Sequence, residues 1–263
     1  MENKTGMRKN SIQPLQGGGE SQRVGLARAL SKLGYCSRSQ AARLIRAGRV
    51  RLNGAMRRDP ETPVRLGSDR IEVDQERVGG KKKIYLMLNK PRGLVTTASD
   101  EKGRDTVYSC LPNLSWVAPV GRLDKASEGL LLLTNDSEWA ARIADPESHL
   151  PKTYHVQIGA IADVAITDKL MEGVYVAKHG LLRATSAEVI RQGERNSWLS
   201  IVLDEGKNRQ IRRMLDALGI EVLRLVRVAI GAVELGKLPK GASRPLTPQE
   251  KSTLNVPVSG EKP

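Results

Sequence analysis

The chain changes character at residues 79–83, a Gly-Gly-Lys-Lys-Lys run. Residues 21–80 carry 13 basic and 6 acidic residues, a net charge of +7, which is half of the +14 of the whole chain. The residues that follow are more apolar and more balanced in charge. A chain of 263 residues is long enough for one small and one larger domain. The composition therefore predicts a basic domain over residues 21–78, a linker over 79–83 and a larger domain over 84–248.

The overall charge narrows the class of partner. Basic residues number 43 and acidic residues 29, and such an excess favours a polyanion, either nucleic acid or an anionic membrane face. Aromatic residues make up only 3 % and Phe is absent, which argues against an extended platform of stacking rings for single strands. If the partner is RNA, we therefore expect charge and shape to provide most of the binding.

Both ends of the chain lack a regular apolar pattern. Residues 1–20 end in three consecutive glycines and predict a disordered tail, and residues 249–263 predict a flexible C-terminal tail. No apolar run approaches the roughly 18 residues of a membrane span, and the N-terminus shows no apolar signal segment. Two cysteines are too few for a disulfide framework. These features predict a cytoplasmic protein.

The basic segment has the signals of two short helices and a hairpin. Leu26, Ala29, Leu30 and Leu33 recur at helical spacing, and a glycine follows them. Ser37 and Gln40 have the spacing of a capping box, which opens a second helix that ends at Gly48. Residues 49–53 then alternate between polar and apolar up to an Asn-Gly turn at 53–54.

The run from residue 37 to residue 54, SRSQAARLIRAGRVRLNG, resembles the alpha-L RNA-binding domain of a small-subunit ribosomal protein and of several RNA-modifying enzymes. The resemblance implies that the exposed arginines of this domain contact RNA phosphates, which makes binding depend on salt without selecting a sequence. The alternative is an ordinary small domain with a solvated basic surface. The arginines concerned are Arg38, Arg43, Arg46, Arg49 and Arg51.

The larger domain mixes strands and helices without regular alternation. This pattern predicts an α+β fold, with a mixed, mostly antiparallel sheet flanked by helices. Neither a phosphate-loop nor a dinucleotide fingerprint is present, and the three histidines lack ligand spacing, so we expect no metal site. The predicted strands are 84–88, 116–120, 130–134, 153–159, 198–203 and 222–228, and the predicted helices are 137–144, 162–171 and 208–218.

Two segments of this domain are candidates for chemistry. Asp124 stands on a short polar loop between two apolar strands, and a loop held rigidly by strands suits a catalytic carboxylate. Tyr154 lies near the start of the next predicted strand. Each has a simpler explanation as well, because Asp124 fits a turn cap and Tyr154 fits a half-buried strand residue.

A third segment, EGKNRQIRRM over residues 205–214, combines a helix start with several cations. An apolar face at helical spacing predicts that this helix docks on the core, with Arg209 and Arg212 together beside that face. A helix N-terminus with Lys207 and Arg209 near it attracts a phosphate or a carboxylate. A plain alternative is that Arg212 pairs with Asp216 on the same helix.

Four segments in order resemble bacterial ribosomal-RNA pseudouridine synthases of the RsuA/RluB type, which carry an N-terminal alpha-L domain. The resemblance covers residues 21 to about 248. Position 127 is a departure, because threonine is common there and this chain has Ser127, which keeps the hydroxyl. The segments are YLMLNKPRGLVTT (85–97), GRLDKASEGLLLLTND (121–136), KTYHVQI (152–158) and EGKNRQIRRM (205–214).

The resemblance implies an isomerase that detaches uracil from ribose and reattaches it through carbon without a cofactor. Asp124 matches the essential aspartate, as nucleophile or base, and Tyr154 the tyrosine that packs on the target base. Arg212 matches the basic residue that pairs with the aspartate, with Arg209 as second choice, and Arg122 the arginine that helps displace the nucleotide. Glu128 is interpreted as a loop or surface residue.

The predicted function is therefore rRNA modification in ribosome biogenesis, in ribosomal RNA or a pre-ribosomal particle, by a monomer. The Asn208-Arg209 pair favours the large-subunit branch. The alternative from another class is a noncatalytic RNA-binding assembly factor on the same scaffold. An intact set of Asp124, Tyr154 and Arg212 distinguishes the two, because a binder does not need all three.

Overall fold

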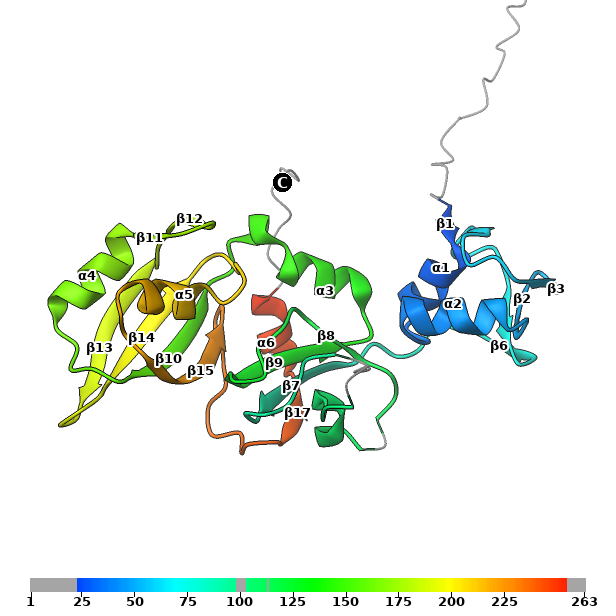
Figure 1. Ribbon diagram of the computed structural model, residues 1–263. Coiled ribbons are helices and arrows are strands. Elements are labelled where there is room, and N and C mark those ends of the chain that lie inside the picture. The colour runs from blue at the N-terminus through cyan, green and yellow to red at the C-terminus, as the bar shows by residue number, and fades with distance from the viewer. Residues whose placement is uncertain (1–22, 98–102, 113, 255–263) are drawn as a thin grey trace, which may run out of the picture.

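A computed structural model describes residues 23–97, 103–112 and 114–254 of the chain. The predicted tail over residues 1–20 and the last residues, 255–263, lie outside the described residues. Figure 1 shows a small domain at one end of the molecule and a larger domain built around a sheet. The α+β class and the mixed, mostly antiparallel sheet that the sequence predicts are confirmed.

The small domain begins with two helices whose predicted boundaries are confirmed. The Ser37 hydroxyl accepts from the Gln40 amide at 3.1 Å, and the Gln40 side chain accepts from the Ser37 amide at 3.0 Å, which completes the capping box. Gly48 ends the second helix at φ +74°, a conformation that favours glycine. The elements are β1 (Val24–Gly25), α1 (Leu26–Lys32), α2 (Arg38–Arg46), β2 (Val50–Leu52), β3 (Ala55–Arg57), β4 (Pro63–Val64), β5 (Ile71–Val73) and β6 (Glu76–Arg77).

The predicted hairpin of the small domain is also present. Strands β2 and β3 pair across Asn53 and Gly54, which both have positive φ, as a two-residue hairpin turn requires. Val50 and Leu52 are buried under α1 and α2, whereas Arg51 between them is exposed. The alternation therefore buries the apolar face and leaves the arginines in solvent.

The larger domain is organised by a sheet to which nine of the described strands belong, in the order β13-β14-β10-β15-β9-β7-β17, with β16 beside β15 and β8 beside β9. Each predicted strand and helix has a counterpart; the helix at 137–144 has the predicted bounds, and the ends of the others are shifted by a few residues. The elements are β7 (Tyr85–Lys90), η1 (Val107–Cys110), β8 (Ala118–Pro119), β9 (Glu128–Thr134), α3 (Ser137–Ala144), η2 (Pro146–Ser148), β10 (Lys152–Ile158), α4 (Val164–Glu172), β11 (Val174–Val176), β12 (Gly180–Leu182), β13 (Ser186–Gln192), β14 (Ser197–Leu203), α5 (Gln210–Ala217), β15 (Val222–Ile230), β16 (Val233–Glu234), β17 (Ser243–Pro245) and α6 (Pro248–Thr253).

The two halves of this sheet are covered differently. All seven residues of β9 are buried, because its odd-numbered and even-numbered leucines pack into separate apolar clusters on the two faces. Strands β10, β14 and β15 bury one face under α4 and α5, and their other face is only half-buried. This difference explains why β9 is a continuous leucine run while β10 alternates.

The two halves join at a short parallel seam between β9 and β15. Only two residue pairs form it, Val226 with Glu128 and Arg227 with Gly129, whereas every other strand pair of the sheet is antiparallel. Gly129 has φ +100°, and a Cβ added there would stand 2.2 Å from the carbonyl oxygen of Arg227. Glycine is therefore required for the strands to meet, and the seam opens beside the loop that carries Asp124.

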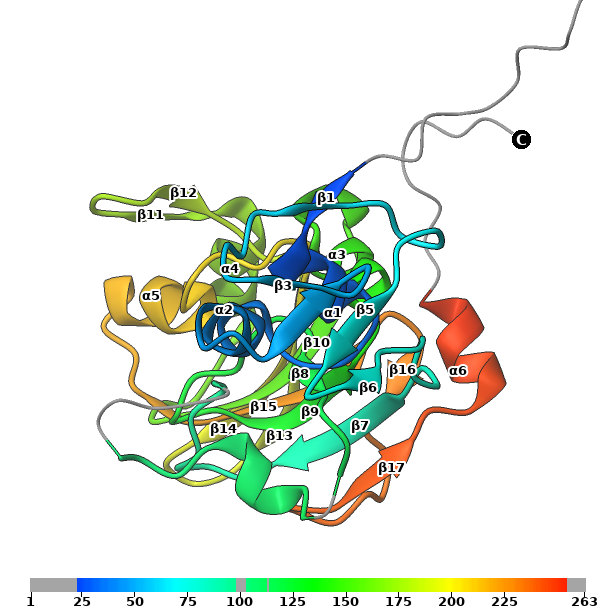
Figure 2. The ribbon, with the colours of Figure 1, turned by 90° about the vertical axis from the view of Figure 1, so that its right-hand side faces the viewer.

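The prediction of a flexible tail from residue 249 is wrong for residues 249–254. Helix α6 extends to Thr253, with a capping box between Thr247 and Glu250 and with Pro248 in its first turn. Arg244 on β17 holds Glu250 at 2.8 and 2.6 Å, and this interaction lowers the pKa of Glu250 to about 2. Leu254 after the helix is buried. Figure 2 shows α6 following β17 at the edge of the sheet.

The predicted linker residues contact both domains. The Asn135 side chain accepts from the Ile84 amide at 2.8 Å and donates to the Lys82 carbonyl at 3.0 Å. Lys32 of α1 pairs with Glu138 of α3 at 2.9 Å. The Lys83 ammonium donates to the Lys32 carbonyl at 3.2 Å, so the linker contacts the small domain as well as the larger one. None of the helices in the described ranges combines the length and apolar character that a membrane span needs.

Candidate active site

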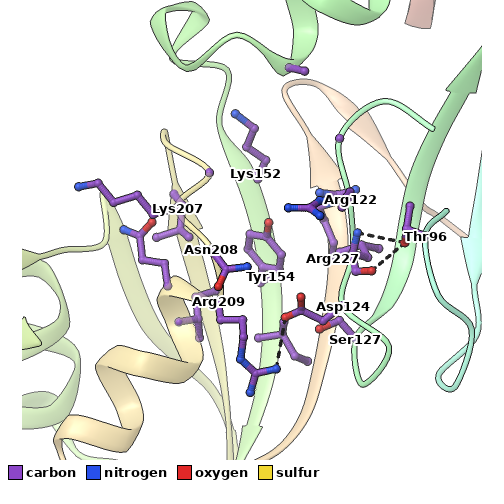
Figure 3. Close-up of a pocket in the computed structure, with 18 of the residues that line it drawn as sticks. Thr96, Arg122, Asp124, Ser127, Lys152, Tyr154, Lys207, Asn208, Arg209 and Arg227 are labelled. Atoms are coloured by element: carbon purple, nitrogen blue, oxygen red, sulfur yellow. Dashed lines mark hydrogen bonds and ion pairs between the residues drawn. The ribbon is translucent and has the colours of Figure 1, made fainter. Parts of the chain in front are cut away.

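A cleft of about 990 Å³ lies where β9, β10 and β15 meet. Its walls are the 121–127 loop before β9 on one side and the loop between β14 and α5 on the other, and Tyr154 stands between them (Figure 3). Eight basic residues line the cleft and only two acidic ones, Asp124 and Glu205. The cleft is therefore strongly basic, and the Asp124 carboxylate lines it from the 121–127 loop.

Asp124 occupies the predicted rigid loop. Its side chain is partly exposed and faces the cleft. The residue before it, Leu123, is buried and exchanges two hydrogen bonds with the Thr96 hydroxyl, which donates to its carbonyl at 2.7 Å and accepts from its amide at 3.3 Å (Figure 3). The Ser127 amide donates to the Asp124 carbonyl at 3.0 Å and closes the turn. The backbone around the carboxylate is thus held on both sides.

Lys90, at the end of β7, holds the backbone of the loop that carries Asp124. Its side chain is fully buried, and the ammonium donates to the carbonyls of Pro91, Asp124 and Ser127 at 3.1, 3.1 and 2.8 Å. Burial lowers the pKa of Lys90 to about 8, against the opposing effect of the Asp124 and Glu128 carboxylates. Three donors on one buried cation fix the curvature of the loop and hence the direction of Asp124.

The cation that pairs with Asp124 is Arg209. Its Nη1 lies 3.8 Å from Asp124 Oδ2, and both side chains are partly exposed (Figure 3). The sequence predicts a helix from residue 208, but α5 begins at Gln210, and Arg209 precedes it with φ +53° in the left-handed region. This conformation, unusual for a residue other than glycine, places Arg209 at the mouth of the helix across the cleft from Asp124.

Arg212 does not form the direct ion pair with Asp124 that the resemblance implies. Its Nη2 donates to the Ala126 carbonyl at 3.2 Å and its Nη1 to the Val222 carbonyl at 3.4 Å. Burial and the nearby Arg209 lower the pKa of Arg212, whereas Asp124 raises it, so the two side chains still attract one another. Arg212 therefore joins α5 to the Asp124 loop through the loop backbone.

Tyr154 lies on β10 directly opposite Arg227 on β15, and both side chains line the cleft. The tyrosine is half-buried, and it packs against apolar residues of both halves of the sheet. Its ring therefore stands at the seam, in a position where a flat ring inserted into the cleft meets it near Asp124 (Figure 3). The position predicted near the start of a strand is confirmed.

Glu128 is not the loop or surface residue that the sequence suggests. It is the first residue of β9 and only 3 % exposed. Its carboxylate accepts from Arg224 at 2.8 and 3.1 Å and pairs with Lys240. Val226, its seam partner, shares its face of the sheet, whereas Arg227 lines the cleft on the other face. Glu128 therefore points away from Asp124.

The predicted RNA-binding residues occupy two separate places. Arg122, Lys207 and Arg209 line the cleft, with Lys207 paired to Glu205 at 2.9 Å. The arginines of the small domain are all exposed, and Arg49 among them is bonded to Asp74. The exposed arginines of the small domain are Arg38, Arg43, Arg46, Arg49 and Arg51.

Several site residues escaped the sequence reasoning. Lys90 follows five apolar or amide residues of a buried strand, and Arg227 interrupts the apolar run of β15; a charge inside such a run was the available signal. Thr96 carries no such sequence signal, because threonine is common in loops. The burial of Glu128 could not be predicted, because its partners Arg224 and Lys240 are about a hundred residues away in sequence.

Comparisons with known proteins show which family the chain resembles. Residues 84–217 match the family of RNA pseudouridylate synthases, and residues 24–78 match the S4 domain. The chain is 35 % identical over 234 residues to "Ribosomal large subunit pseudouridine synthase B" of Bacillus subtilis, covering 88 % of this chain and 95 % of the relative. It is 37 % identical over 221 residues to an uncharacterised RNA pseudouridine synthase of Rickettsia prowazekii, covering 82 % and 91 %.

Among solved structures, one described as "Crystal structure of pseudouridylate synthase" superposes with a TM-score of 0.63 at 31 % identity and covers 88 % of this chain and 99 % of that one. The similarity thus extends over both domains. The fold places one carboxylate, on a loop held by its backbone, in a basic cleft, and the matches cover most of the chain. This chain therefore belongs to the RNA pseudouridylate synthase family, with an N-terminal S4 domain.

Proposed function

We propose that this protein converts a specific uridine of ribosomal RNA, in the large subunit, to pseudouridine. The observation that carries the proposal is Asp124, a carboxylate presented on a braced loop into a cleft lined by eight cations. The choice of large-subunit RNA is supported by the name of the Bacillus subtilis relative, a large-subunit pseudouridine synthase.

In the proposed reaction the bond between N1 of uracil and C1′ of ribose breaks, and a bond between C5 and C1′ forms. The proton on C5 leaves, and N1 gains one. Asp124 acts either on C1′ as a nucleophile or as a base, in chemistry related to that of retaining glycosidases. Because uracil leaves and returns within one cleft, no hydrolytic water needs activation. A second catalytic carboxylate and a cofactor are therefore not required.

The remaining cleft residues have positioning roles in this proposal. Tyr154 packs on the extruded base and assists removal of the C5 proton. Arg122, exposed at the rim, fills the space that the target nucleotide vacates, since extruding a base costs a few kcal/mol. Arg209 orients the Asp124 carboxylate through their ion pair, and Arg212 holds the loop backbone.

The S4 domain supplies affinity for folded RNA. Its exposed arginines neutralise phosphates, so that binding weakens steeply with salt. We propose that the substrate is ribosomal RNA or a pre-ribosomal particle, that the enzyme acts as a monomer, and that it works in the cytoplasm where ribosomes assemble.

The competing function, a noncatalytic assembly factor, needs the basic surface but not the braced carboxylate. Mapping pseudouridines in the rRNA of cells that lack this protein tests both. We expect one pseudouridine to disappear, and the wild-type gene, but not the Asp124→Asn variant, to restore it. An unchanged set of pseudouridines would reject the enzymatic proposal and favour the assembly factor.

A further inference from the structure

The two ends of the cleft differ in charge balance. At one end Asp124 and Arg209 face each other and largely neutralise one another. At the other end the cleft is lined by Lys152 and Arg227, and within the described residues neither of these side chains forms an ion pair with an acid. Figure 3 shows Lys152 on the far side of Tyr154 from Asp124. This unpaired positive end has no role in the chemistry described above.

Arg227 is only 6 % exposed, and its hydrogen-bonding capacity is not used up. Its Nε donates to the Leu130 carbonyl at 2.8 Å, whereas its Nη2 is buried without a partner. A guanidinium left partly unsatisfied in the interior is unfavourable unless a ligand completes it. Arg227 also stands opposite Tyr154 in the sheet, so its free donors lie beside the ring proposed to receive the base.

Lys152 lies two residues before Tyr154 on β10, which places it on the same face at a rise of ~6.8 Å along the strand. Its half-buried side chain forms no hydrogen bond within the described residues. Burial and the neighbouring Arg227 lower the pKa of Lys152, while Asp204 opposes them. Two like charges held close together in this way are stabilised by an anion that binds both.

We propose that Lys152 and Arg227 form the subsite for a backbone phosphodiester next to the target uridine. A planar guanidinium and an ammonium together suit a phosphate, because the first donates in a fork and the second adapts to the remaining oxygen. The inference rests on the proposed function and deepens it, since it sets the direction of the RNA. The base stacks at Tyr154 with its ribose toward Asp124, and the adjoining phosphate lies at the Lys152 end.

The test is a binding cycle on the full-length enzyme with a hairpin oligonucleotide that carries the mapped uridine. In two versions an uncharged methylphosphonate replaces the phosphodiester on the 5′ or the 3′ side of that uridine. Lys152→Met should weaken binding of the natural RNA about ten-fold and reduce the salt slope by about one phosphate. Lys169→Met on α4, which removes an exposed charge outside the cleft, is the matched control and should bind as the wild type does.

The cycle separates the outcomes. We expect one of the two methylphosphonates to weaken wild-type binding by a similar factor, and Lys152→Met to add little to that loss. Two results would overturn the subsite. In one, Lys152→Met and each methylphosphonate weaken binding independently, so that their combined loss of affinity is about a hundred-fold for both RNAs. In the other, Lys152→Met binds RNA as tightly as Lys169→Met does. The same binding cycle is repeated with Arg227→Gln, after its melting temperature has shown that this variant folds.

Failure of the proposed function has a different signature. In that case the wild-type enzyme forms no pseudouridine in the natural hairpin, whatever its affinity. If turnover is normal and the methylphosphonate cycle is additive, the phosphate subsite alone is rejected. The binding measurement and the turnover measurement therefore report on separate claims.

Discussion

Asp124 and Glu128 are four residues apart in sequence but point to opposite faces of the sheet, and their surroundings are opposite in kind. Asp124 is partly exposed, and its ion pair with Arg209 is long, at 3.8 Å. Glu128 is buried and bonded to Arg224 and Lys240. Burial alone would raise the pKa of Glu128, but these two cations lower it overall. The comparison teaches that a carboxylate available for chemistry is held through its backbone, whereas a structural one is held through its oxygens.

The largest expected effect is on the exposed carboxylate. Asp124→Asn should lower pseudouridine formation by at least about a thousand-fold, because the amide can act neither as nucleophile nor as base. The melting temperature and the affinity for rRNA should stay near those of the wild type, because the loop is held by its backbone. Single-turnover assays with the mapped RNA measure this, and substantial residual turnover would remove Asp124 from its role.

The next effect distinguishes the two arginines near Asp124. Arg212→Ala should lower activity by about a hundred-fold and lower the melting temperature, because it removes the donor to Ala126 and leaves a cavity beside the loop. Arg209→Ala should lower activity at most about five-fold with stability unchanged, because its ion pair is half-exposed. A reversed order would mean that direct pairing with the carboxylate, and not the loop backbone, controls Asp124.

The buried carboxylate should respond in stability. Glu128→Gln should lower the free energy of unfolding by about 2 kcal/mol, less than for a fully buried pair because Arg224 and Lys240 are partly exposed. Denaturant titration measures the loss, and Glu147→Gln on the exposed turn η2 is a matched control. An unchanged unfolding free energy would remove the distinction between the two carboxylates.

The same carboxylate predicts a dependence of stability on pH. The pKa of Glu128 is lower in the folded protein than in the unfolded chain, where it is about 4.3. Its contribution is therefore fully present above the unfolded pKa and is lost as the pH falls through the folded pKa. Denaturant titrations from pH 6 down to pH 3 should show a shallower decline for Glu128→Gln than for the wild type. Parallel declines would contradict the lowered pKa.

The smallest effect lies far from both carboxylates. Replacing Arg38, Arg43 and Arg46 together by glutamine should leave turnover at saturating RNA unchanged. Binding should weaken, and the slope of log affinity against log salt should fall by about 2 to 3, because all three are exposed. Fluorescence anisotropy at several salt concentrations checks this, and an unaltered slope would mean that the S4 domain holds RNA in another way.

Local signals predicted the small domain well. Its helix start at Ser37, its stop at Gly48 and its turn at Asn53-Gly54 each depend on residues a few positions apart, and all are present. Helix α6 was missed although Thr247 and Glu250 carry the same capping signal, because the segment lacks an apolar period. In the larger domain the positions of Asp124 and Tyr154 followed from the strands on either side of them.

The sequence by itself determined that this chain has a basic S4 domain, a larger mixed domain, and a carboxylate on a loop between core strands. Only the tertiary structure decided that Arg209 and not Arg212 faces Asp124, that Lys90 braces the loop, and that Glu128 is buried. The physical reason is that these contacts join residues from 34 to more than a hundred positions apart. Local propensity has no information about such partners, because they meet only when β7 and β15 pair with β9 on its two sides.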